Sequence, residues 1–167
     1  TVVKRLKAAG AIILGKTHTV EFAFGGWGTN TTMGTPWNPW DMAVHRIPGG
    51  SSSGSAVAVA AGMACAALGT DTGGSVRIPA GLCGLVGLKT THGLISRYGL
   101  IDLCPTHDTV GTLTRTVRDS ATLLDVLAGA DPRDKETSIS PSRSVSKDLE
   151  KGVRGMRVWV LPDAERC

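Results

Sequence analysis

The stretch that decides the fold is Pro48–Thr91, PGGSSSGSAVAVAAGMACAALGTDTGGSVRIPAGLCGLVGLKTT. Two glycine- and serine-rich segments in it, Gly50–Gly54 and Asp71–Arg77, flank an alanine-rich run at residues 56–68. Small side chains cover every face of that run, which predicts a buried helix that approaches its neighbours closely. Glycine makes up 22 of the 167 residues, about twice the usual share. Most of the excess lies in or near this stretch, which indicates tight turns and backbone brought close to other groups.

Outward from this stretch, helical and strand patterns alternate. Residues 1–9 show apolar residues at helical spacing, Gly10 is a natural stop, and Ala11–Leu14 reads as a buried strand. Thr116 and Asp119 open a helix in the manner of a capping box, with Gly129 as its stop. The run MRVWVL at residues 156–161 predicts a further strand. Helices that alternate with short apolar strands indicate an α/β layered architecture.

Two stretches lack regular patterning. Residues 25–55 form a long loop rich in Gly, Pro, Asn and Thr, and loops of that length in compact domains are usually functional. Three tryptophans in it, Trp27, Trp37 and Trp40, either fix the loop to the core, which we favour, or line a pocket. Residues from about 131 to 150 form a polar linker.

Composition excludes several classes of protein. The formal charge of +4 is not concentrated in a stripe, and aromatic residues are too sparse for base stacking, so we expect no direct nucleic-acid binding. No apolar segment reaches about 18 residues, so we expect no membrane span. The four cysteines form no C-x-x-C pair and the chain has no H-E-x-x-H motif, so we expect reduced thiols, a cytoplasmic protein and no metal.

Two short motif matches suggest other chemistry. GAIILGKT at residues 10–17 matches the phosphate-loop pattern with Lys16 as its lysine, but a helix and not a strand precedes it, and its variable positions are apolar. Gly50–Gly54 matches the G-x-S-x-G nucleophile elbow, with Asp71 and His92 as conceivable triad partners, yet Pro48 and two glycines are poor strand material. A glycine-rich turn whose serines cap a helix is the structural alternative at both serine-rich segments.

The whole arrangement resembles the amidase signature family, from Gly10 to about Pro132. Four features occur in the family's order within the signature core, residues 48–91: a glycine-serine cluster, an alanine helix, T-D-T-G-G-S and C-G-x-V-G-x-K. The flanking segments GKTHTVEFAFGG, NPWD and GTLTRTVRD are also similar to family segments. The resemblance implies an α/β/α fold with a mixed central sheet, of which residues 1–167 form only a part, with N- and C-terminal parts of the parent missing.

The resemblance also implies roles for individual residues. Ser75 matches the nucleophile that attacks an amide carbonyl and forms an acyl-enzyme. Ser51 matches a bridging serine that is held by a cis peptide and relays a proton. The backbone of Thr72, Gly73, Gly74 and Ser75 matches the oxyanion hole. The signature residues Asp71, Arg77 and Ser52 are expected to brace the loops, and no cofactor or metal is implied.

The family's base is a lysine in a K-D motif upstream of the segment that opens this chain. By alignment, neither Lys16 nor Lys89 takes that place, so we expect the chain alone to be inactive. The resemblance implies that the parent hydrolyses the C–N bond of a small carboxamide by the Ser-cisSer-Lys mechanism, with a homodimer possible. The alternative is the glutaminase component of the tRNA-dependent amidotransferase, its A subunit, which works with partner subunits. Two more remote alternatives are a phosphate-loop nucleotide binder and an inactive structural fragment.

Overall fold

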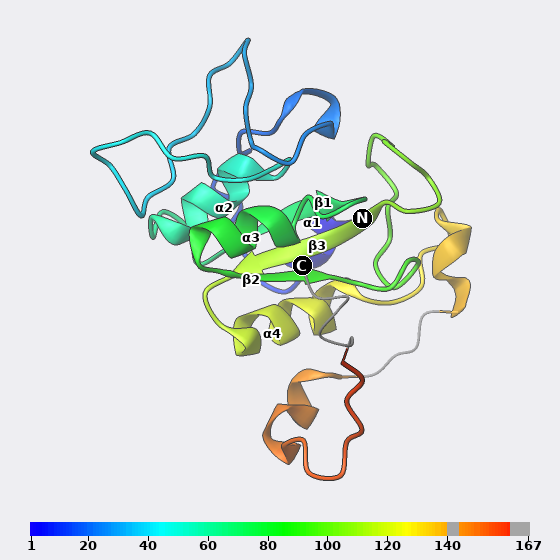
Figure 1. Cartoon of the computed structure of the whole chain (residues 1–167). Helices are drawn as coiled ribbons and strands as arrows, with labels where there is room; N and C mark the ends of the chain where they lie inside the picture. Colours follow the sequence, from blue (N-terminus) through cyan, green and yellow to red (C-terminus); the bar gives the residue numbers. More distant parts are fainter. Residues whose placement is uncertain (140–143, 161–167) are drawn as a thin grey trace.

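The computed structural model describes residues 1–139 and 144–160. A three-stranded sheet lies at its centre, with β3 (Thr109–Thr114) between β1 (Ala66–Asp71) and β2 (Val86–Lys89) and antiparallel to both. The helices α2 (Ser53–Ala60) and α3 (Arg77–Cys83) cover one face, and α4 (Val117–Leu127) covers the other (Figure 1). The α/β/α layering predicted from the sequence is confirmed. The described strands contribute only antiparallel pairs to it.

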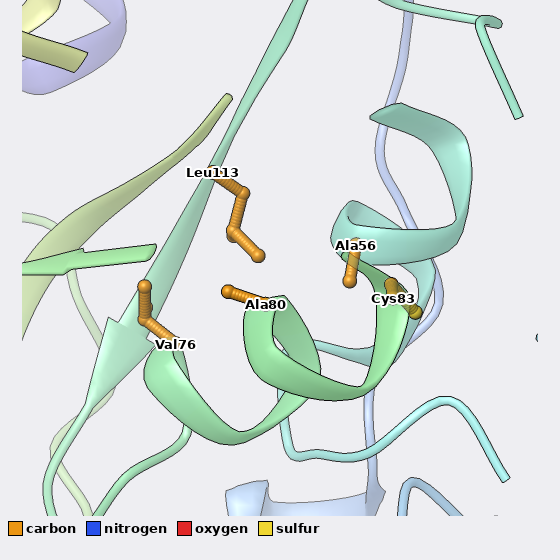
Figure 2. Close-up of a cluster of buried hydrophobic side chains, with 5 residues drawn as sticks. All are labelled: Ala56, Val76, Ala80, Cys83 and Leu113. Atoms are coloured by element: carbon orange, nitrogen blue, oxygen red, sulfur yellow. The ribbon is translucent and has the colours of Figure 1, made fainter. Parts of the chain in front are cut away.

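Alternating side chains of β3 build two cores. Leu113 points to the side of α2 and α3, where it packs with Ala56, Val76, Ala80 and Cys83 (Figure 2). Small residues on the two helices let them approach the sheet closely. The alanine-rich composition therefore shapes this half of the core.

The opposite face of the sheet has its own cluster. Val110 of β3 packs with Ile95 and with Leu127 of α4, all nearly fully buried. The helix α1 (Val2–Ala8) adds Val2 and Leu6 to the edge of this cluster. The predicted amphipathic helix at the start of the chain is thus confirmed, and its apolar side faces α4.

The alanine-rich run is helical only in its first part. Gly62 adopts a left-handed φ of 73° after α2, and residues from Ala66 onward form β1, paired with β3 from Ala66↔Thr114 to Asp71↔Thr109. The prediction of one helix over residues 56–68 was wrong because pairing with β3 decides the conformation of the second part. Alanine composition alone does not distinguish a strand from a helix in such a setting.

Two predicted strands do not form. Residues 11–14 have no regular structure, with Ile12 85% and Leu14 74% exposed. Residues 156–160 likewise have no regular structure and are exposed, while Leu161 lies outside the described residues. A strand needs a neighbour for its backbone hydrogen bonds, and within residues 1–139 and 144–160 neither segment has one. Apolar composition therefore predicted strands that the described sheet does not contain.

The helix predicted from Thr116 is confirmed as α4. The Thr116 hydroxyl accepts a hydrogen bond from the backbone N–H of Asp119 at 3.1 Å. It also donates to the Asp119 carboxylate at 2.7 Å, so the carboxylate binds the capping hydroxyl and not the N-cap backbone N–H. This reciprocal pair fixes the first turn of α4 directly after β3.

The described part of the polar stretch after α4 contains regular structure. Two short 3₁₀ helices, η2 (Lys135–Ile139) and η3 (Ser146–Lys151), lie there, with residues 140–143 outside the described part. The Asp125 carboxylate of α4 accepts the backbone N–H of Val145 at 2.7 Å and so attaches the second of them. None of the helices in the described part of the chain is long and apolar enough to cross a bilayer.

In the long loop before α2, one tryptophan contacts the core. The indole N–H of Trp40 donates to the carbonyl of Cys83, at the end of α3, at 2.8 Å. Trp37 stacks on His45 within the loop, and Trp27 is mostly exposed. Trp40 is itself 75% exposed, so this hydrogen bond is its contact with the core, and the fixing role favoured from the sequence stays a prediction.

Candidate active site

Two loops meet on the α2/α3 side of the sheet. The first, Gly49–Ser52, precedes α2, and the second, Thr72–Val76, connects β1 to α3. The backbone N–H of Ser52 donates to the carbonyl of Ser75 at 3.1 Å. The hydroxyl of Ser52 also accepts the backbone N–H of Thr70 at 3.2 Å. Ser52 therefore joins the two serine-rich segments.

Close approach at this junction depends on a glycine of β1. A Cβ atom placed on Gly69 would lie 2.5 Å from the hydroxyl oxygen of Ser52, a distance that real Cβ atoms essentially never show. Any larger residue at position 69 would push the first loop away from the sheet. The glycine within the strand pattern thus marks the place where another segment meets the strand.

Ser51 is buried within the first loop. The peptide bond between Gly50 and Ser51 is cis, the geometry that the resemblance implies. Ser51 is only 2% exposed, and its carbonyl accepts the N–H of Val20 at 3.1 Å. The N–H of Gly50 donates to the carbonyl of Gly26 at 2.7 Å. Backbone on both sides of the cis bond is therefore held by the segment 20–26.

Asp71 organises the second loop. Its buried carboxylate accepts the backbone N–H groups of Gly74 at 2.8 Å and Val76 at 3.1 Å. The Arg77 side chain binds both carboxylate oxygens, at 2.9 and 3.0 Å. Burial raises the pKa of Asp71, but the hydrogen bonds from Arg77 and the loop N–H groups outweigh it, so the pKa is lowered overall. Asp71 is thus an ionised brace for the loop.

Ser75 is half-buried between Asp71 and α3. Within residues 1–139 and 144–160, neither its hydroxyl nor that of Ser51 has a hydrogen-bond partner at normal distance. The Gly74 N–H is already used by Asp71, whereas no loop hydrogen bond from described residues occupies the N–H groups of Gly73 and Ser75. The loop thus presents an unengaged hydroxyl beside unengaged N–H groups, as acyl transfer requires.

A third loop supports this arrangement, and sequence reasoning missed it. Asp108, 2% exposed and directly before β3, accepts a hydrogen bond from the Thr72 hydroxyl. Its other oxygen accepts the N–H groups of Leu103 and Cys104 at 2.8 and 2.9 Å. A charged residue directly before the strand TVGTLT was the available signal, since a buried carboxylate needs several donors.

The two other motif matches and the remaining candidate residues lack the surroundings that their chemistry requires. Lys16 is exposed and follows a helix and an irregular segment, so the phosphate-loop context is absent. Lys89 donates to the Thr90 carbonyl at 3.0 Å, and His92 contacts the Pro105 carbonyl. No strand precedes Gly50 in the described part of the chain, and Asp71 is engaged by Arg77, so the nucleophile-elbow reading fails. No cluster within the described residues could hold a metal.

A family profile described as Amidase matches residues 1–167, so the chain belongs to the Amidase family.

Particular relatives agree with that assignment. The A subunit of the glutamyl-tRNA(Gln) amidotransferase of Roseiflexus castenholzii is 52% identical over 160 residues, which is 96% of this chain and 32% of the relative. The crystal structure of the corresponding Thermotoga maritima protein is 48% identical, with a TM-score of 0.88 over 93% of this chain and 34% of that one. The peptide amidase of Stenotrophomonas maltophilia is 46% identical, with a TM-score of 0.78 over 85% and 30%. The chain thus spans about a third of the length of these relatives.

Proposed function

We propose that the protein containing this chain hydrolyses the C–N bond of a carboxamide through an acyl-enzyme on Ser75. The observation that carries the proposal is the hydrogen bond from Ser52 N–H to the Ser75 carbonyl, because it holds the two serine-rich loops together. Membership of the Amidase family supports the same chemistry.

In the proposed mechanism, the Ser75 hydroxyl attacks the amide carbonyl and passes its proton to Ser51. The carbonyl oxygen becomes an oxyanion, which the backbone N–H groups of the second loop stabilise. Of the four expected donors, Gly74 gives its N–H to Asp71 here. Thr72, Gly73 and Ser75 are therefore the positions to which we assign this role. The amine leaves with a proton, and water then releases the acid from Ser75.

The proposal needs a base that receives the proton from Ser51. No lysine within residues 1–139 and 144–160 hydrogen-bonds either serine hydroxyl. We therefore propose that the base is a lysine outside this chain, as the resemblance implies, and that the chain by itself is inactive. Asp71 and Arg77 hold the loop in place and take no part in bond making.

A second candidate is the glutaminase component of a tRNA-dependent amidotransferase. The curated relatives from Roseiflexus castenholzii and Alkaliphilus metalliredigens, 52% and 51% identical, are both named as the A subunit of glutamyl-tRNA(Gln) amidotransferase. This function requires partner subunits. A stand-alone amidase requires none, and a homodimer of it would contain only copies of this protein. A cytoplasmic location fits both candidates and stays a prediction.

The test uses the longest protein that the coding sequence specifies. We expect a fluorophosphonate to label Ser75 and amide hydrolysis to disappear in Ser75→Ala, while the 167-residue chain alone hydrolyses nothing. Glutamine hydrolysis that rises on addition of co-purified subunits favours the amidotransferase, and hydrolysis of other carboxamides by the protein alone favours the amidase. Failure of both labelling and hydrolysis contradicts the proposal.

A further inference from the structure

A thiol and an imidazole meet on the loop before β3. The Sγ atom of Cys104 lies 3.4 Å from Nδ1 of His107, and the Thr106 hydroxyl oxygen lies 2.8 Å from the same nitrogen. Cys104 is partly exposed and His107 is exposed, so a reagent in solution can reach both. The chemistry proposed for Ser75 and Ser51 does not use this pair.

The turn that carries the pair is fixed at both ends. The N–H groups of His107 and Asp108 both donate to the carbonyl of Cys104 at 2.9 Å, which brings positions 104 and 107 to one side of the turn. The N–H of Cys104 in turn donates to the buried Asp108 carboxylate. The imidazole of His92 adds a contact to the Pro105 carbonyl at 3.0 Å. The thiol and the imidazole are thus held together before any reagent arrives.

The other described cysteines provide two contrasts. Cys83 is 1% exposed, contacts the Pro48 carbonyl, and burial raises its pKa to about 11, so it is a poor nucleophile. Cys65 is exposed, but it makes no contact with a histidine in the described part of the chain. Cys104 is therefore the described cysteine that combines access with an adjacent base.

We propose that Cys104 and His107 form a modification site for low-molecular-weight disulfides such as oxidised glutathione. The Cys104 thiol gives its proton to His107, and its sulfur attacks one sulfur of the reagent. The S–S bond of the reagent breaks, a mixed disulfide forms at Cys104, and the departing thiolate takes the proton from His107. Cys104 is oxidised and half of the reagent is reduced, so no further oxidant is needed.

Oxidised glutathione is the probe, applied under native conditions to the longest protein that the coding sequence specifies. Mass spectrometry of proteolytic peptides follows adduct formation at each cysteine over time. We expect Cys104 to react about tenfold or more faster than Cys65, because an adjacent base typically adds at least that factor. Cys83 is expected to stay unmodified until the protein is unfolded.

The matched variant is His107→Asn, which keeps a polar side chain at the exposed turn but removes the base. It is expected to lower the rate at Cys104 to about that of Cys65 and to leave Cys65 unchanged. The Cys65 rate and the protection of Cys83 report in the same sample that the fold is intact. Equal rates at Cys104 and Cys65 in the unmodified protein, or a Cys104 rate that His107→Asn does not change, would overturn the proposal. The result does not depend on amidase activity.

Discussion

The backbone N–H of Ser52 donates to the carbonyl of Ser75 at 3.1 Å, although 23 positions of sequence separate the two residues. This bond joins the loop that carries the cis peptide at Ser51 to the loop braced by Asp71. Since main-chain atoms make it, side-chain substitutions at either serine leave it in place. The roles of Ser51 and Ser75 can therefore be tested by substituting their side chains without breaking this bond between the loops.

Replacing Ser75 or Ser51 is expected to abolish activity and to leave the fold intact. In the full-length protein, Ser75→Ala and Ser51→Ala should each lower kcat/KM for amide hydrolysis by about 10⁴-fold or more, because each removes a member of the catalytic unit that we propose. Thr122→Ala, on the exposed side of α4, is the control and should retain activity. Steady-state kinetics and the melting temperature check this. A Ser75→Ala protein with more than a tenth of the activity contradicts the assignment.

Loss of the Asp71 charge is expected to destabilise the protein. In Asp71→Asn, the amide presents N–H donors to groups that themselves donate, so we expect a loss of about 1–3 kcal/mol in the free energy of unfolding. Arg77 is half exposed and can be hydrated, which keeps the loss in this range. Urea denaturation measures it. Asp41→Asn breaks the exposed pair with Arg46 and serves as the control, with a change near the measurement error.

The same carboxylate should make stability depend on pH. The pKa of Asp71 is lower in the folded state than its ordinary value, so its contribution is complete above about pH 4 and is lost as the pH falls through the folded pKa. The difference in unfolding free energy between the unmodified protein and Asp71→Asn should therefore shrink below about pH 4. A difference that stays constant down to about pH 2 would show that folding does not lower the pKa of Asp71.

The core against α2 and α3 should be sensitive to Leu113. Its side chain is completely buried in the cluster of Figure 2, so Leu113→Ala should lower the free energy of unfolding by about 2–5 kcal/mol. Val117→Ala, at a position 60% exposed on α4, should change it by less than about 0.5 kcal/mol. Chemical denaturation compares the two. A loss below about 1 kcal/mol at Leu113 would mean that the cluster is loosely packed.

A mixed disulfide at Cys104 should also lower amide hydrolysis. Asp108 binds the N–H of Cys104 and the hydroxyl of Thr72, so bulk at Cys104 acts on the second loop through one carboxylate. We expect treatment with oxidised glutathione to lower kcat more than it raises KM, and a thiol reductant to restore it. The Cys104→Ser variant should hydrolyse the amide, and oxidised glutathione should not lower that activity. Inhibition that persists in Cys104→Ser would place the effect at another cysteine.

The sequence by itself determined the layers, the family and the order of the serine-rich segments. Glycines and serines at fixed spacing in Pro48–Thr91 predicted the two loops, and the Thr116 cap predicted α4, because turn and cap chemistry is local. The helix that the sequence places before the phosphate-loop match at Lys16 is also present.

Only the tertiary structure decided which apolar segments become strands and which donors are free. Ala66–Asp71 pairs with β3, whereas Ala11–Leu14 finds no partner among the described residues, although the second is the more apolar run. Likewise, the hydrogen bond from the Thr72 hydroxyl to Asp108 joins two residues that lie 36 positions apart in the sequence. Strand pairing and buried hydrogen bonds are long-range, so their partners cannot be found from local pattern.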